Sequence, residues 1–517
     1  MEIRKLVVVG YGMAAQRLLE ALAEQCRGGS AIREITVVGD EGLEAYDRVN
    51  LATALDAHNV RSLCFDRPDF PDHVKVIYQP SNPAIDLSLQ PNHVRLQDGG
   101  AAPFDALVLA TGADAARPSI PGSKADGCFV FRSAGKLNVS RKAIIVGGGL
   151  LGIELARHLH ERGQKVHIIE CGPHLMPLQM DYLGAEVITR TLRAMGVEVL
   201  TNTLVKDILL TNSRVSGVRI DGGVTIDADF VVFATGIRPR DALAASTKLA
   251  VGKRGGFVVD NYCRTNVERV FAIGDCAVMN NQVYGLVAPA YLMADALGRT
   301  LTTGNAHPVE LPAVCAKLKF TGCDTVSFGD SRAVTSGVKA SILHIPGINL
   351  YRKLVTQADG SRLIGGILVG DITKYSEHLH WVNSGDLLGD RLADLLMPPA
   401  RRTESEIPND AIICSCLNVR MGDIAKAVRE NGCATLADIK LHTKAGTGCG
   451  GCQPAIAEIL YKELRKRGLA RIRARLWQVP SHGEILRGLP MVPVWRAGLY
   501  PSRGRVGEAL SGIANSA

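Results

Sequence analysis

The sequence predicts an α/β fold with two Rossmann-like dinucleotide-binding domains, followed by two smaller domains. Two observations predict the larger part. A Gly-rich loop lies between an apolar strand and a helix near the N-terminus, and the same arrangement recurs further along the chain. A third observation is composition, since 46% hydrophobic and 21% charged residues are typical of globular proteins. A chain of 517 residues is long enough for several domains, each with its own core.

The first loop lies in the stretch KLVVVGYGMAAQRLLEAL, which predicts a buried strand, a turn and a helix. Gly10 allows the tight turn, Gly12 lets the backbone approach a pyrophosphate, and Ala15 keeps the helix close to the strand. The helix N-terminus offers free N–H groups and the positive end of its dipole to a phosphate. The next strand, REITVVGDE, ends in Asp40, which is placed to bind a ribose hydroxyl.

The second loop lies in KAIIVGGGLLGIELARHL and has Gly147, Gly149 and Gly152 in the same three positions. Its next strand, KVHIIE, ends in Glu170. A carboxylate there accepts the 2′-hydroxyl of NADH and repels the 2′-phosphate of NADPH, and no Arg follows closely, so we expect NADH. Two such loops indicate that one dinucleotide passes hydride to another.

The order of these motifs resembles that of the two-dinucleotide flavoprotein reductases. LVLATGA, with Thr111 and Gly112, is similar to the family's crossover from the FAD half to the NAD half. VVFATGIRP, with Gly236, is similar to the return crossover, and RVFAIGDCA to the second FAD motif. The resemblance implies that Thr111 and Gly112 contact FAD and that Gly236 contacts NAD. It implies an FAD-binding domain made of residues 1–113 and 245–305, with an NAD-binding domain, 114–244, inserted in it.

The same resemblance assigns roles to four further residues. It implies that Asp275 binds the ribityl or pyrophosphate part of FAD, that Arg132 is the flavin-side arginine, and that Ala288 lies beside the flavin ring. It also implies that Glu154 is an acid near the nicotinamide, which makes it the candidate catalytic residue. Taken alone, Arg132 and Glu154 could equally be surface ion-pairing groups.

The positions of the cysteines in the first 330 residues argue against disulfide reductase and peroxidase activity, both of which occur among similar flavoproteins. Reductases that use a redox disulfide or a peroxidatic cysteine need a cysteine beside the flavin, and the corresponding stretch, YDRVNLATAL, has none. We therefore exclude disulfide reductase and peroxidase activity and expect these cysteines to be small buried hydrophobes. They are Cys26, Cys64, Cys128, Cys171, Cys263, Cys276, Cys315 and Cys323.

The expected location is the cytoplasm. The chain enters a strand directly, so no export signal is expected, and the 13 cysteines fit a reducing compartment. No apolar run reaches the roughly 18 residues that a membrane helix needs, so no membrane association is expected. From Arg465 onward the basic residues exceed the acidic ones by the whole net charge of +8. This basic tail, 466–517, could dock an acidic partner or be solvated, and nucleic acid is not an expected partner.

Residues 306–398 predict a small α+β domain, with a hairpin around Asp359 and Gly360. The region resembles the small C-terminal domain in the flavoprotein part of NADH-dependent nitrite reductases and of assimilatory nitrate reductase electron-transfer subunits. The resemblance implies that it covers the flavin, and it allows a homodimer. Lys317 is expected to be solvated or to serve docking. A Pro- and charge-rich linker, 399–409, follows.

Residues 410–465 carry four paired cysteines: Cys414 and Cys416 in ICSCLNV, and Cys449 and Cys452 in TGCGGCQP. Thiolates suit zinc or an iron–sulfur cluster. Structural zinc usually takes two CxxC pairs, whereas a CxC pair and the glycines around the second pair favour a cluster. The region resembles the bacterioferritin-associated-ferredoxin type of helical [2Fe–2S] domain, which is preferred over zinc. Cys433 has no partner and is interpreted as structural.

These parts predict an electron path from NADH to FAD, then to the cluster, then to an acceptor. Apart from the tail 466–517, the chain resembles the electron-transfer subunit of assimilatory nitrate reductase. It has no molybdopterin region and no second cysteine set for a sirohaem centre, so a separate catalytic subunit is implied as partner. Two alternatives stay open. One is an NADH-dependent reductase of a free ferredoxin or rubredoxin, or a feeder of a sirohaem nitrite reductase. The other is a non-enzymatic redox sensor.

Overall fold

The computed structural model describes residues 2–54, 60–132, 141–311, 313, 315–318, 323–398, 407–414, 417–448 and 450–466. The described residues all belong to one unit of the chain. Most of the predicted linker and the predicted basic tail beyond Lys466 lie outside them, as do Cys416 and Cys449. Within the described residues, no helix combines the length and the apolar character needed to cross a membrane.

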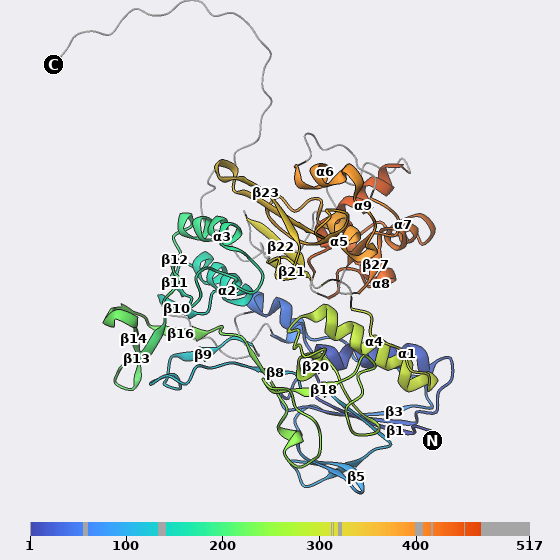
Figure 1. The fold of residues 1–517 in the computed structure, drawn as a ribbon. Coiled ribbons are helices and arrows are strands. Elements are labelled where there is room, and N and C mark those ends of the chain that lie inside the picture. The colour runs from blue at the N-terminus through green and yellow to red at the C-terminus, as the bar shows by residue number, and fades with distance from the viewer. Residues whose placement is uncertain are drawn as a thin grey trace, which may run out of the picture. The chain divides into compact units, whose positions relative to one another are not determined.

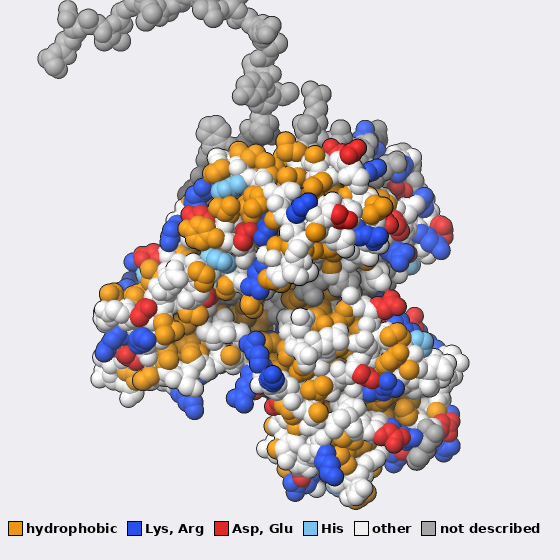
Figure 2. Space-filling model, in the orientation of Figure 1, with side chains coloured by type: hydrophobic (Ala, Val, Ile, Leu, Met, Phe, Trp, Pro, Cys, Tyr) orange, Lys and Arg blue, Asp and Glu red, His pale blue; other side chains and the backbone are white. Residues whose placement is uncertain are grey.

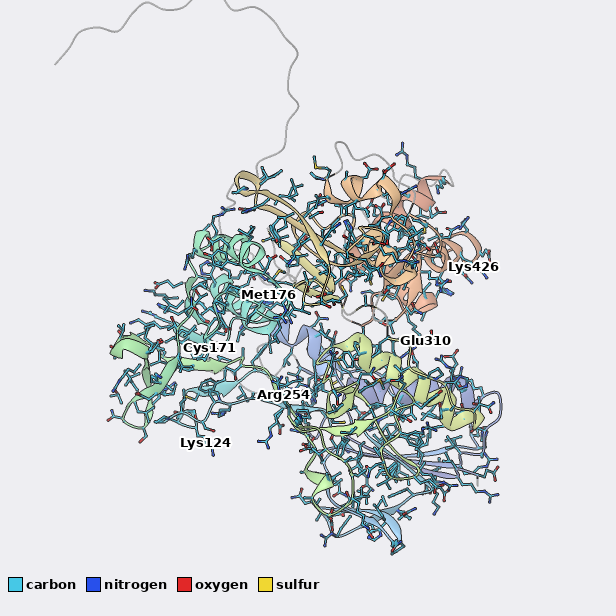
Figure 3. All side chains as sticks on the ribbon, viewed as in Figure 1. Lys124, Cys171, Met176, Arg254, Glu310 and Lys426 are labelled. Atoms are coloured by element: carbon cyan, nitrogen blue, oxygen red, sulfur yellow. The ribbon has the colours of Figure 1, made fainter. Side chains whose placement is uncertain are left out.

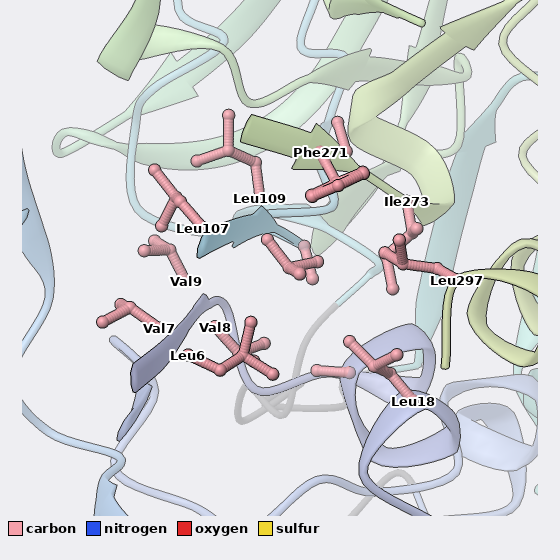
Figure 4. Close-up of a cluster of buried hydrophobic side chains, with 14 of the residues drawn as sticks. Leu6, Val7, Val8, Val9, Leu18, Leu107, Leu109, Phe271, Ile273 and Leu297 are labelled. Carbon is pink, nitrogen blue, oxygen red and sulfur yellow. The ribbon is translucent and has the colours of Figure 1, made fainter. Parts of the chain in front are cut away.

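The first dinucleotide loop is carried by a parallel five-stranded sheet (Figure 1). Its strands, in spatial order, are β19 (Val270–Ala272), β7 (Ala106–Leu109), β1 (Lys5–Val9), β2 (Glu34–Val38) and β3 (Lys75–Gln79). Helices α1 (Met13–Cys26) and α4 (Val287–Thr303) pack against each other. Leu18 of α1 and Leu297 of α4 join the apolar strand residues in one buried core (Figure 4). The near-continuous apolar runs of these strands are typical of a parallel sheet that is buried on both faces.

The second loop is carried by another parallel five-stranded sheet. Its strands, in spatial order, are β12 (Glu198–Leu200), β11 (Lys165–Ile169), β10 (Lys142–Val146), β16 (Phe230–Phe233) and β9 (Cys128–Val130). Helices α2 (Leu150–Glu161) and α3 (Tyr182–Ala194) belong to this half. β8 (Ala113–Ala115) pairs antiparallel with β17 (Ile237–Pro239), so the two crossings between the halves lie side by side. Two parallel sheets, each behind a Gly-rich loop and joined by two adjacent crossings, are the arrangement that the sequence predicts.

Smaller sheets complete these two halves. The strands β4 (Ala84–Leu89), β5 (Asn92–Leu96) and β6 (Ala101–Pro103) form one antiparallel sheet, and β13 (Val205–Thr211), β14 (Arg214–Ile220) and β15 (Thr225–Asp227) form another. β18 (Phe257–Val259) pairs in parallel with β20 (Ala277–Met279).

The third region is an antiparallel sheet with two helices. Its strands, in spatial order, are β21 (Cys315–Leu318), β22 (Asp324–Gly329), β25 (Leu363–Gly370), β24 (Leu350–Thr356) and β23 (Lys339–Ile345), and its helices are α5 (Tyr375–Ser384) and α6 (Leu392–Leu396). The predicted hairpin is present as β24 and β25, with Gly360 in the left-handed region. Asp181, just before α3, holds this region against the NAD half, because it accepts from Tyr351 Oη at 2.6 Å and pairs with Lys353 Nζ at 3.1 Å.

The last described region is small and mainly helical, as predicted. A short antiparallel pair, β26 (Ile412–Cys414) and β27 (Val419–Arg420), precedes α7 (Met421–Glu430), α8 (Leu436–Thr443) and α9 (Gln453–Lys466). Thr435 and Asp438 form a capping box at the start of α8, which satisfies two backbone donors there. Ile424, Val428 and Leu460 are buried among these helices.

Candidate functional site

Gly10 and Gly147 make the same contact in the two dinucleotide loops. Both have positive φ, +103° and +114°. A Cβ on Gly10 would lie 2.2 Å from the carbonyl oxygen of Ala110, and one on Gly147 would lie 2.4 Å from that of Ala234. Each of those carbonyls begins the Ala-Thr-Gly segment after a neighbouring strand. The sequence interpretation of a tight turn at both glycines therefore has a steric basis as well as a conformational one.

The second glycine of each loop leaves room for a ligand. Gly12 and Gly149 are the N-cap residues of α1 and α2. A Cβ on Gly12 would come no nearer than 4.0 Å to a neighbour, the Nε of Arg48, and one on Gly149 would have nothing within 4 Å. Neither helix has an acidic residue in its first turn. These open backbone positions at helix N-termini fit the pyrophosphate of a dinucleotide.

The third position of each loop serves packing. A Cβ on Gly152 would lie 2.1 Å from the carbonyl oxygen of Gly147, and Ala15 is fully buried. The helix thus lies directly against its loop in both halves, as the sequence predicts.

The acids at the ends of the second strands differ between the halves. Glu170 is buried, and its carboxylate accepts from the backbone N–H groups of Gly148 and Gly172, each at 2.7 Å. The strand register makes Gly39, not Asp40, the counterpart of Glu170. Asp40 lies one residue further, is exposed, and pairs with Arg240 at 2.8 Å. Its contact with a ribose stays a prediction.

Arg132 and Asp275 come together on the FAD side. Arg132 donates to the Asp275 carboxylate, and its Nε donates to the carbonyl oxygen of Ala113 at 2.6 Å. Arg132 does form an ion pair, as one interpretation of the sequence allowed, but its partner is Asp275, which is itself a predicted FAD-binding residue. Thr111 donates to the carbonyl oxygen of Arg240 at 2.6 Å, which ties the two crossings together beside this pair.

One cavity of about 1000 Å³ connects these elements. One face of the molecule is hollowed near its centre in the space-filling view (Figure 2). Of the predicted site residues that the structure describes, Ala15 and Gly152 are absent from the cavity lining, because they pack against their loops. The predicted residues that line it are Gly10, Gly12, Asp40, Thr111, Gly112, Arg132, Gly147, Gly149, Glu154, Glu170, Gly236, Asp275, Ala288, Cys414 and Cys452.

Cys414 and Cys452 reach this cavity from different elements. Cys414 ends β26, Cys452 immediately precedes α9, and both side chains are buried. Gly450, two residues before Cys452, has a φ of +67°, so the chain turns sharply there. The other two predicted ligands lie outside the described residues. Two soft sulfur donors from separate segments that line one cavity fit an iron–sulfur cluster or zinc.

The sequence interpretation did not place three further residues at this cavity. Lys317, Cys315 and Tyr375 also line the cavity. Lys317 is not simply solvated, since its Nζ donates to the carbonyl oxygen of Gly451 at 2.6 Å. Cys315 and Lys317 are two residues apart on β21 and so lie on the same face of the sheet. This spacing was the sequence signal that could have placed them together.

The expectation that the early cysteines are all buried was wrong for three of the eight. Cys171, labelled in Figure 3, is exposed, and Cys64 and Cys315 are half-buried. Cys171 and Cys315 line the cavity. Partial desolvation and the neighbouring Glu170 carboxylate raise the pKa of the Cys171 thiol, which disfavours its reactive thiolate form. Cys26, Cys263 and Cys276 are buried, as expected.

Comparison with family models finds two matches. Residues 4–294 match "Pyridine nucleotide-disulphide oxidoreductase", which covers more than half of the chain. Residues 412–462 match "BFD-like [2Fe-2S] binding domain".

Curated relatives extend the likeness along most of the chain. It is 35% identical over 480 residues to the nitrite reductase (NADH) large subunit of Escherichia coli K12, covering 90% of this chain and 56% of that one. It is 28% identical over 475 residues to the assimilatory nitrate reductase electron transfer subunit of Bacillus subtilis 168, covering 89% and 60%. The chain spans about half the length of the nitrite reductases that it matches.

Among solved structures, an NAD-dependent persulfide reductase from A. fulgidus superposes with a TM-score of 0.65 at 24% identity, covering 77% of this chain and 80% of that one. This likeness concerns the fold.

Proposed function

The chain belongs to the pyridine nucleotide-disulphide oxidoreductase family, and on that premise we propose that it takes electrons from NADH and delivers them to a separate catalytic subunit of nitrate reduction. The observation that carries this proposal is the shared cavity, whose lining includes both dinucleotide loops and also Cys414 and Cys452. A donor site and an exit site that border one cavity need no mobile carrier between them.

The cofactors are FAD, NADH and a [2Fe–2S] cluster. When bound, a flavin accepts hydride and can release electrons singly, and a [2Fe–2S] cluster carries one electron. The residues proposed to hold FAD are Gly10, Gly12, Ala15, Asp40, Thr111, Gly112, Arg132, Asp275 and Ala288. Those proposed for NADH are Gly147, Gly149, Gly152, Glu170 and Gly236, with Glu154 as the acid near the nicotinamide, and those for the cluster are Cys414, Cys416, Cys449 and Cys452.

The protein's own groups explain how NADH would be chosen. Glu170 is held in place by two backbone N–H groups and is buried, so its oxygens have fixed positions. Such a carboxylate can accept a hydrogen bond from a ribose 2′-hydroxyl, whereas a 2′-phosphate would place like charge against it at low dielectric. On the flavin side, Asp275 and Ala113 fix the orientation of the Arg132 guanidinium at the cavity wall.

The catalytic partner is the finer part of the proposal. The B. subtilis relative is named an electron transfer subunit, which supports a nitrate reductase catalytic subunit as acceptor. The 35% identity to the E. coli protein supports a second candidate, a feeder of a sirohaem nitrite reductase. A free ferredoxin or rubredoxin is a third acceptor. The cytoplasmic location, the homodimer and the division into the domains predicted above belong to the same proposal.

Anaerobic titration of the full chain with NADH tests the proposal. We expect loss of the flavin absorbance followed by the EPR signal of a reduced [2Fe–2S] cluster. Nitrate should then be reduced only after a nitrate reductase catalytic subunit is added. Faster turnover with a sirohaem nitrite reductase would favour the second candidate. Stoichiometric zinc in place of iron would end the proposal, and absence of NADH-driven bleaching would favour a redox sensor.

A further inference from the structure

Lys317 makes a long-range contact that the electron-transfer proposal does not use. It lies on β21, one of the two edge strands of the third sheet as described, and is partly buried. Its Nζ donates to the carbonyl oxygen of Gly451 at 2.6 Å, across 134 residues of sequence. The contact therefore joins the third region to the region of the four cysteines.

The accepting peptide lies in the turn that carries two predicted ligands. Gly451 stands directly before Cys452, and Gly450 has a left-handed conformation with a φ of +67°. Such a turn depends on its hydrogen bonds, because glycines restrict the backbone little. A donor at the Gly451 oxygen fixes the direction of the peptide that leads into Cys452.

The same lysine also lies close to an aromatic ring of the third region. Its Nζ lies 5.5 Å from the ring centroid of Tyr375, the first residue of α5. Lys317 and Tyr375 line the cavity that Gly12 and Ala288 also line. Elsewhere α5 contacts β26, which ends in Cys414. Lys317 is thus bonded to the turn that carries Cys452, and through Tyr375 it lies close to the helix that contacts the strand of Cys414.

We infer that Lys317 is a positioning residue that ties the Gly450–Cys452 turn to the third region and places a fixed positive charge beside the cluster thiolates. This inference rests on the proposed function. A cluster with four thiolates becomes more negative on reduction, so a nearby ammonium favours the reduced state. The lysine therefore acts on the cluster's midpoint potential and on the order of the turn, not on hydride transfer from NADH.

Three variants of the full-length holoprotein separate charge from hydrogen bonding. Lys317→Met removes both, Lys317→Gln keeps a donor without the charge, and Lys317→Arg keeps the charge. Lys426→Met is the matched control, since Lys426 is exposed on α7 and pairs only loosely with Glu430, at 3.8 Å. The readouts are the EPR-monitored midpoint potential, amide hydrogen exchange at Gly450 and Gly451, and NADH-driven flavin bleaching.

We expect Lys317→Met and Lys317→Gln to lower the ratio of reduced to oxidised cluster at a fixed potential about tenfold, which is about 59 mV for one electron. Hydrogen exchange of the turn should rise severalfold in Lys317→Met and less in Lys317→Gln. Lys317→Arg should restore most of the potential, and bleaching should stay within about twofold in every variant, as should all readouts of Lys426→Met.

Two results would overturn the inference. One is an unchanged potential in both neutral variants, and the other is unchanged exchange of the turn in Lys317→Met. If Lys317→Met fails to retain iron, Lys317→Gln and Lys317→Arg still decide the role of the charge. A wild-type protein without an NADH-reducible cluster signal would refute the proposed function instead, so the two failures are distinguishable.

Discussion

The Glu170 carboxylate accepts a hydrogen bond from the backbone N–H of Gly148, at 2.7 Å, within the second dinucleotide loop. This contact fixes an acid at the loop, where a ribose would lie in the proposed NADH complex. Glu170→Gln should therefore reduce the preference for NADH over NADPH about tenfold, because it removes the charge that repels a 2′-phosphate. The measurement is kcat/KM with each nucleotide. Glu161→Gln, an exposed change on α2, is the control, and equal discrimination by wild type and Glu170→Gln would refute the ribose assignment.

The glycine contacts predict a stability effect in one half of the molecule. Gly147→Ala should lower the free energy of unfolding by about 2–4 kcal/mol, because the new Cβ would overlap the carbonyl oxygen of Ala234. It should also abolish NADH-driven bleaching while flavin is retained. Gly163→Ala is the matched control, since its φ is also positive, at +81°, but a Cβ there would meet nothing within 4 Å. Equal losses in thermal unfolding would show that conformation alone, not the overlap, sets the cost.

The ion pair between Arg132 and Asp275 predicts coupled effects on flavin retention. Arg132→Met and Asp275→Asn should each weaken FAD binding, measured as flavin per chain after dialysis. The double variant should lose less than the two single losses combined, by about 1 kcal/mol, because each single change leaves a partly buried charge without its partner. Additive losses would mean that the two residues act on FAD independently.

The buried sulfurs predict a separation of functions. Cys452→Ser should remove the cluster, measured as iron content and EPR signal, and stop electron delivery to a partner protein, while NADH still bleaches the flavin. Cys433→Ser is the control, because Cys433 is also buried in this region but was interpreted as structural. Delivery that survives without iron would show that the flavin reaches the acceptor directly.

A buried histidine predicts a pH dependence of stability. His378 is fully buried, and burial lowers its pKa to about 4, although both ring nitrogens lie close to backbone carbonyl oxygens. The unfolded chain therefore binds a proton that the folded chain does not between about pH 6.5 and 4. The stability that His378 contributes is fully present above pH 6.5 and is lost as the pH falls toward 4.

Urea unfolding at pH 7.5 and pH 5.5 checks this. Wild type should lose about 1 kcal/mol more over that interval than His378→Gln. His442→Gln, at an exposed position on α8, should behave as wild type. Equal losses in wild type and His378→Gln would contradict the assignment.

Local sequence patterns predicted the FAD half and the NAD half well. Contacts between segments that are distant in sequence could not be predicted from these patterns. Gly10 and Gly147 lie in short strand–loop–helix patterns, where neighbouring residues determine the conformation. The contact from Lys317 to Gly451 depends on how the third region packs against the cysteine region, and the hydrophobic pattern of the sequence contains no information about it. The one-residue offset of Asp40 from the counterpart of Glu170 escaped the sequence for a similar reason, since it becomes visible only from the strand register.

The order of the strands has a consequence for synthesis of the chain. The sheet behind the second loop is built only from residues between Cys128 and Phe233, whereas the sheet behind the first loop gains its edge strand β19 at Val270–Ala272. A chain that leaves the ribosome N-terminus first can complete the inner sheet while the outer sheet still waits for its last strand. The paired segments β8 and β17 then connect the NAD half, whose sheet can already be complete, to the FAD half, whose sheet still lacks β19.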